Sequence, residues 1–271
     1  MINVRYYGKE PFQVAVIHGG PGAPGSVAAI ARELSKNYGV LEPIQTKTSL
    51  EGQVLELYGV LKAFGDLPIT LIGHSWGAWL AYIITARYPS LTNKLILVGS
   101  GPFEEKYVKS LKEKRFSRLN SKENKDFQFI TDELNSPETE EQEKKIIRLG
   151  ELVSKTDNFK TIEIETEEHD RIRSKGNTFQ LVWNEASKLR KTGSLLEFGK
   201  QIKCPVVAIH GDYDPHPAEG IHTPLKNVIK DFRFYLIKKC GHSPWKEQYA
   251  NKRFYKIIRE EIDSIRYTAK L

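Results

Sequence analysis

Cysteine is scarce in this sequence, with Cys204 and Cys240 the two in 271 residues. Cys204 opens one predicted strand and Cys240 closes another, so in a parallel sheet the two thiols would lie at opposite ends. A disulfide needs Cα atoms within about 7 Å of each other. We therefore predict two unpaired thiols, which fit a reducing compartment.

Long apolar runs are absent as well. No run approaches the roughly 20 residues that a membrane-spanning helix needs, so the sequence excludes a membrane partner. The first residues, 1–7, lack the layout of a secretory signal peptide. Together with the unpaired thiols, this predicts a cytoplasmic protein.

A large excess of one charge is also missing. The formal net charge is +7, and residues 101–200 carry equal numbers of basic and acidic side chains. Much of the surplus lies in the last predicted helix, where Glu260, Glu261 and Asp263 are interspersed among lysines and arginines. Such mixing is typical of a solvated helix face and excludes a nucleic-acid patch, which leaves a small-molecule substrate as the expected partner.

What the sequence does contain is a regular alternation of short apolar runs and amphipathic stretches. Short continuous apolar runs are typical of parallel strands buried on both faces. The predicted strands are Val14–Ile17, Ile69–Ile72, Leu95–Val98, Val206–Ile209 and Phe232–Ile237. The predicted helices are Ser26–Asn37, with Ser26 as its N-cap, Ser49–Phe64 and Trp76–Tyr88. Strands that alternate with helices predict an α/β protein with a doubly wound, mostly parallel sheet.

Residues 103–200 interrupt this alternation. They are rich in charge and helical in pattern, for example over Phe179–Phe198, and contain no convincing strand. We interpret them as a helical cap inserted between two strands of the sheet. The predicted organisation is a core of residues 1–102 and 201–271 with a cap insertion of residues 103–200.

The clearest chemical motif is Gly73-His74-Ser75-Trp76-Gly77, a G-x-S-x-G string between the strand Ile69–Ile72 and a predicted helix. This context is typical of a nucleophile elbow, a strained turn that lifts a serine oxygen clear of a sheet. Glycines are needed there because the backbones pass closely. Ser75 is therefore the candidate nucleophile, whereas His74 beside it is expected to be structural.

An acid and a base follow downstream, in the chain order that a serine triad on such a sheet uses. His242, in Gly241-His242-Ser243, is the candidate general base that accepts and returns the serine proton. Asp214, in Gly211-Asp212-Tyr213-Asp214, is the candidate acid that orients the imidazole. Asp212 is the alternative acid.

A glycine-rich string, His18-Gly19-Gly20-Pro21-Gly22, follows the strand Val14–Ile17. The backbone N–H groups of Gly20 and of Trp76, the residue after the candidate nucleophile, are the predicted oxyanion-hole donors. The string lacks the spacing of a phosphate-binding loop, and no cysteine cluster or ligand helix supports a metal site. We expect neither a cofactor nor a metal.

These residues resemble the α/β-hydrolase superfamily, and within it the proline iminopeptidase-like branch. The resemblance rests on the string at 18–22 and on the tryptophan after the nucleophile, and it covers residues 1–100 and 201–271. It implies the α/β-hydrolase fold, the triad Ser75, Asp214 and His242, and an oxyanion hole formed by Gly20 and Trp76. The D-Q-R-G-type stretch usual in that branch is missing, since residues 42–46 read Glu-Pro-Ile-Gln-Thr.

We therefore predict a serine hydrolase that cleaves a small ester or amide through an acyl-enzyme intermediate. One alternative is a proline iminopeptidase-type aminopeptidase, which needs cap carboxylates to bind the substrate ammonium. The candidate carboxylates are Glu163, Glu165, Glu167, Glu168 and Glu185. The other alternative is a non-catalytic ligand-binding protein on the same fold. The aromatic side chains of Trp79, Phe103, Trp183 and Trp245 either line an apolar pocket or belong to the core.

Overall fold

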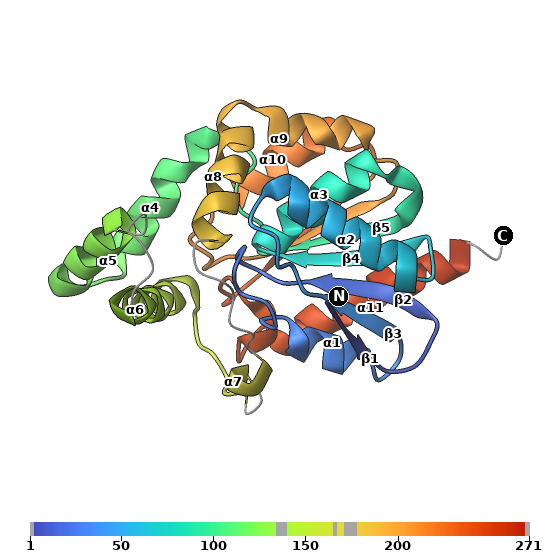
Figure 1. Ribbon diagram of the computed structural model, residues 1–271, viewed down its shortest axis with the longest axis horizontal. Helices are drawn as coiled ribbons and strands as arrows, with labels where there is room; N and C mark the ends of the chain where they lie inside the picture. The colour runs from blue at the N-terminus through green and yellow to red at the C-terminus, as the bar shows by residue number, and fades with distance from the viewer. Residues whose placement is uncertain (1–2, 134–139, 165–166, 171–177, 269–271) are drawn as a thin grey trace.

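The computed structural model describes residues 3–133, 140–164, 167–170 and 178–268, and these residues build a seven-stranded sheet flanked by helices (Figure 1). The strands lie in the order β1-β3-β2-β4-β5-β6-β7, and all neighbours are parallel except β1 and β3. Their bounds are β1 (Val4–Tyr7), β2 (Phe12–Ile17), β3 (Gly39–Pro43), β4 (Ile69–His74), β5 (Thr92–Val98), β6 (Val206–Gly211) and β7 (Phe232–Ile237). All five predicted strands and the mostly parallel sheet are confirmed.

The helices follow the strands in alternation, as predicted. Their bounds are α1 (Ala28–Leu34), α2 (Leu50–Phe64), α3 (Trp76–Arg87), α4 (Val108–Ser117), α5 (Ser121–Glu133), α6 (Glu140–Asp157), α7 (Glu167–Asp170), α8 (Thr178–Lys191), α9 (Ser194–Glu197), α10 (Glu219–Val228) and α11 (Asn251–Thr268). Short 3₁₀ helices lie at Pro89–Leu91, Glu105–Tyr107, Phe198–Gln201 and Pro244–Lys246. None of the helices in the described ranges is long and apolar enough to cross a bilayer.

The sheet is covered on both faces. Helices α1 and α11 lie on one face, and α2, α3 and α10 lie on the other (Figure 1). Neighbouring residues of one strand alternate between the two cores: Leu71 packs under α3, whereas Ile72 belongs to the cluster under α1 and α11. Burial of both faces explains why the strands read as continuous apolar runs.

Two predicted helices differ from the structure at their ends. Ser26 is not the N-cap of α1, because that helix begins at Ala28 and no side chain caps it. The stretch Phe179–Phe198 is interrupted at Gly193, whose φ of +79° is the left-handed conformation that ends a helix. By contrast, α2 begins as predicted, since the Ser49 hydroxyl accepts from the Gly52 N–H at 3.1 Å.

Between β5 and β6 the described residues form helices and no strand. Figure 1 shows α4, α5 and α6 extending away from the sheet, while α8 and α9 lie against the sheet's helical layer. Val182, Ala186 and Leu195 are buried in the same core as α3. The second half of this inserted segment therefore shares the core of the sheet domain.

The two thiols are free. Burial raises the pKa of the Cys204 thiol to about 11, and burial also raises the pKa of Cys240. Because the thiolate is the reactive form, we expect both to react slowly in the native protein and completely after denaturation without reductant. Mass spectrometry of the alkylated protein measures this. A mass that shows one internal disulfide would contradict the strand arrangement.

Candidate active site

The candidate catalytic residues follow the carboxyl ends of parallel strands. Ser75 comes after β4, Asp214 after β6 and His242 after β7, while Gly20 follows β2. Since these strands are parallel within one sheet, their carboxyl ends lie along one edge, where open α/β sheets bind ligands.

The backbone at Ser75 has a positive φ angle. Ser75 has φ +53° and ψ −114°, which a side chain other than glycine rarely adopts. A Cβ on Gly73 would stand 2.2 Å from the Gly77 carbonyl oxygen, and a Cβ on Gly77 would stand 2.4 Å from the Ile17 carbonyl oxygen. Glycine is therefore required on both sides of the serine, as the motif predicts.

His242 and Asp214 are in direct contact. The His242 Nδ1 donates to Asp214 Oδ2 at 2.7 Å, and the Asp214 carboxylate is fully buried. Burial alone would raise the pKa of Asp214, but His242, His216 and His210 around it hold the pKa well below its usual range. Burial would lower the pKa of His242, but the Asp214 carboxylate outweighs it and the pKa is raised. An ionised Asp214 fixes the Nδ1–H tautomer and leaves Nε2 as the proton acceptor.

Asp212 points elsewhere. Its carboxylate accepts from the Cys240 N–H at 3.3 Å and lies 3.7 Å from the Lys238 ammonium. It makes no hydrogen bond to His242 within the described residues. The geometry thus separates the two candidate acids that the sequence left open.

Ser75 follows His74, whose ring contacts the His242 ring, and no hydrogen bond within the described residues joins Ser75 to His242 or Asp214. A Cβ on Gly19 would stand 3.3 Å from Ser75 Cβ and 2.7 Å from His74 Nδ1. The His74 ring is 4.8 Å from the His242 ring, and its Nε2 lies 3.1 Å from the His242 carbonyl oxygen. His74 therefore connects the elbow to the loop that carries His242. Burial holds its pKa well below the usual range, so it is neutral and structural.

His216 is a participant that sequence reasoning missed. Its backbone N–H donates to Asp214 Oδ1 at 3.0 Å, and its Nδ1 contacts the same oxygen at 2.7 Å. The ring stacks on His242 with centroids 4.6 Å apart. An aspartate side chain that accepts from the backbone N–H two residues later forms an Asx turn. The string Asp214-Pro215-His216 was therefore the only local sequence signal for this contact.

The glycine-rich loop is tied to the elbow helix. Gly20 has φ +54°. The Trp76 indole N–H donates to Gln53 Oε1 at 3.0 Å, and the Gln53 amide donates to the Pro21 carbonyl oxygen at 3.4 Å. His18 is buried behind the loop, where Nε2 accepts from the Gln45 N–H at 3.3 Å. Burial lowers its pKa to about 4.

The four aromatic side chains belong mainly to the core. Trp79, Phe103 and Trp245 are fully buried. Trp183 is half-buried and stacks on Trp79, with centroids 5.5 Å apart and ring planes within 2°. These contacts favour the interpretation that the four aromatic side chains belong to the core rather than line an apolar pocket.

The acids predicted to bind a substrate ammonium are not gathered at the site. Glu163 is exposed. Glu185 Oε2 accepts from the Leu50 N–H at 2.7 Å and so caps the N-terminus of α2. Glu165 and the side chains of Glu167 and Glu168 lie outside the described residues.

One group of described residues has the spacing of a metal site: Asp157, His216 and His242, with ligand atoms within 4.8 Å of one another. Arg115 already occupies both Asp157 oxygens, at 2.9 and 2.5 Å. The rings of His216 and His242 are stacked, with an angle of 24° between their planes. The nitrogen lone pairs lie in the ring planes, so they point side by side rather than toward one common point. The arrangement suits an ion pair beside the histidines better than a metal.

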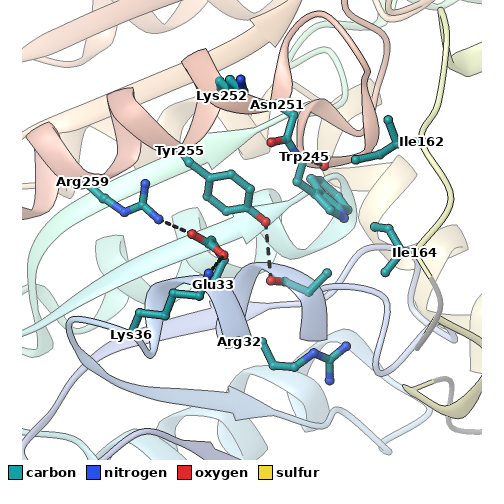
Figure 2. Close-up of a pocket in the computed structure, with 11 residues that line it drawn as sticks. Arg32, Glu33, Lys36, Ile162, Ile164, Trp245, Asn251, Lys252, Tyr255 and Arg259 are labelled. Carbon is teal, nitrogen blue, oxygen red and sulfur yellow. Dashed lines mark hydrogen bonds and ion pairs between the residues drawn. The ribbon is translucent and has the colours of Figure 1, made fainter.

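A cavity of about 500 Å³ lies between α1 and α11 (Figure 2). Ile162, Ile164 and Trp245 close one end, and none of the candidate catalytic residues lines it. Four of its charged side chains are paired: Arg259 and Lys36 contact Glu33 at 2.5 and 2.6 Å, and Arg32 contacts Asp170. We assign no ligand to this cavity.

Comparison with known proteins identifies a family to which this chain is similar. A family model for the alpha/beta hydrolase fold matches residues 53–248. The search of curated protein sequences finds no match.

Solved structures resemble the whole chain. MenH from S. aureus is 20% identical with a TM-score of 0.64, covering 98% of this chain and 100% of that chain. The proline iminopeptidase of Mycobacterium smegmatis is 17% identical with a TM-score of 0.63, covering 98% and 95%. The monoacylglycerol lipase of Paleococcus ferrophilus is 16% identical with a TM-score of 0.60, covering 98% and 99%. At these identities the likeness shows the fold.

Proposed function

We propose, from the premise that this chain belongs to the alpha/beta hydrolase fold family, that it is a serine hydrolase of a small ester or amide. The observation that carries the proposal is the 2.7 Å contact between His242 Nδ1 and the buried Asp214 carboxylate, together with a nucleophile-elbow serine held at φ +53°. A non-catalytic binding protein has no need of this arrangement.

In the proposed reaction Ser75 Oγ attacks the acyl carbon while His242 Nε2 accepts its proton. Asp214 stabilises the imidazolium that forms. The N–H groups of Gly20 and Trp76 stabilise the negative oxygen of the tetrahedral intermediate, and loss of one such donor typically lowers turnover by about 10²–10³. His242 then gives its proton to the leaving group as the bond from the acyl carbon to that group breaks. Water attacks the acyl carbon of the acyl-enzyme while His242 Nε2 accepts its proton, and the bond to Ser75 Oγ breaks as His242 returns a proton to Ser75 and the acid is released.

The inserted helical segment of residues 103–200 is proposed to act as a cap over this edge of the sheet. The segment contacts the candidate site through α6, because the carbonyl oxygen of the last residue of α6 accepts a backbone hydrogen bond from the His242 N–H. The cytoplasm stays our predicted compartment, because both thiols are free.

Among substrates, we favour simple esters over aminoacyl amides. An aminopeptidase must hold the substrate ammonium with a carboxylate, and removal of a buried ionic partner typically costs about 3–5 kcal/mol. Glu185 is instead engaged in capping α2, and Glu163 is in solvent.

This preference predicts the outcome of a substrate panel. Short-acyl esters should be hydrolysed faster than prolyl amides, and ester hydrolysis should survive the single changes of Glu163, Glu165, Glu167, Glu168 and Glu185 to glutamine. Both activities are measured side by side in each variant. One glutamine that destroys prolyl-amide cleavage while sparing esters would favour the iminopeptidase alternative instead.

A further inference from the structure

The loop that carries His242 is anchored on the inserted segment as well as on the sheet. The His242 N–H donates to the Asp157 carbonyl oxygen at 2.7 Å. Asp157 is the last residue of α6. A Cβ on Gly241 would stand only 2.3 Å from the same carbonyl oxygen, so the approach of α6 to this loop leaves no room for a side chain there.

Glu247 links the loop that carries His242 to the residues directly after α6. Its carboxylate is fully buried and accepts from three backbone N–H groups. One is that of Gly241 at 2.8 Å, in the His242 loop, and the others are those of Phe159 at 2.7 Å and Lys160 at 2.8 Å, directly after α6. A buried carboxylate with several N–H donors is strongly held, so the distance from Asp157 to His242 is fixed.

This anchoring places a second carboxylate beside the candidate base. Asp157 is 2% exposed, and one of its oxygens lies within 4.8 Å of ring nitrogens of His216 and His242. Arg115 of α4 donates to Asp157 through Nε at 2.9 Å and Nη2 at 2.5 Å. The Thr156 hydroxyl donates to Asp157 Oδ1 at 2.7 Å.

We propose that Asp157 is a positioning residue for His242, with Arg115 as its counter-charge, so that docking of the inserted segment completes the active site. The inference rests on the proposed role of His242 as general base. Under this proposal α4 and α6 help to set the position and the charge environment of His242. A cap that only covered the substrate would affect neither.

The charges around His242 give this proposal a measurable consequence. The groups that face it are Asp214 and His216 from the loop after β6, His74 from the end of β4, Asp157 from α6 and Arg115 from α4. After Asp214, the negative charge of Asp157 raises the pKa of His242, and the positive charge of Arg115 lowers it. The two members of the ion pair therefore act on His242 in opposite directions.

The test is a titration of His242 by NMR together with the pH dependence of kcat/KM. The base must be neutral, so activity falls as the pH drops through the pKa of His242. Asp157→Asn should move both the NMR titration and the acid limb down by about one pH unit. Arg115→Gln should move both up. The double variant should titrate close to the wild type, because both charges are removed.

Asp212→Asn is the matched control, since no hydrogen bond or ion pair within the described residues joins Asp212 to His242. The His242 titration in this variant should equal that of the wild type. If Asp157→Asn does not fold, Arg115→Gln and the double variant test the same point, because the double variant leaves no buried unpaired charge. A His242 titration unchanged in Asp157→Asn or, if that variant does not fold, in Arg115→Gln, even with lowered activity, would overturn the proposal. Its failure is distinguishable from failure of the proposed function, because the NMR readout does not require turnover.

Discussion

Replacement of Ser75 by alanine is expected to abolish covalent labelling by a fluorophosphonate and to lower ester turnover by about 10⁶, the effect typical of removing a triad serine. The reason is structural, because the elbow holds Ser75 at φ +53°. The glycines on both sides of it stand where an added Cβ would collide with a carbonyl oxygen. Labelling is followed by intact-protein mass and turnover by product release from a short-acyl ester.

The control is Ser117→Ala in α4, whose hydroxyl donates to the Lys114 carbonyl oxygen at 2.9 Å. It should label like the wild type. Equal labelling of Ser75→Ala, or no labelling of the folded wild type, would remove Ser75 from the mechanism and with it the proposed function.

Replacement of Asp214 by asparagine is expected to lower turnover by about 10⁴, as loss of the correct imidazole tautomer does in other triads. An asparagine places an amide against His242 Nδ1 and favours the wrong proton position. It also removes the anion that His242, His216 and His210 surround. Steady-state kinetics at several pH values measures the loss, and circular dichroism shows whether the fold is kept.

Asp212→Asn is the matched comparison, because the two aspartates are two residues apart on one loop. Its carboxylate contacts the Cys240 N–H and Lys238, so turnover should change little. If Asp212→Asn proves the more damaging of the two, the orienting role passes to Asp212.

The parallel sheet could be predicted because its signals are local. A strand buried on both faces must be apolar along its whole length, so Ile69–Ile72 and Phe232–Ile237 are visible in the sequence itself. The short strands β1 and β3 escaped because β1 is an edge strand of four residues and β3 carries Glu42 and Pro43. The helix start at Ser26 was wrong, since α1 begins at Ala28 without a side-chain cap, and the interruption at Gly193, which its left-handed φ produces, was missed.

The sequence by itself determined the elbow at Ser75, the candidate base His242 and the order of the elements. These features are visible in local residue types: glycine where an added Cβ would stand within 2.4 Å of a carbonyl oxygen, apolar side chains where a strand is buried. Tertiary structure alone decided which aspartate meets His242, that His216 shares its carboxylate, that Glu185 caps a helix and that Arg115 and Asp157 reach the histidine from the insertion. Those contacts join residues far apart in the chain, and their distances depend on how the loops and helices pack around the sheet.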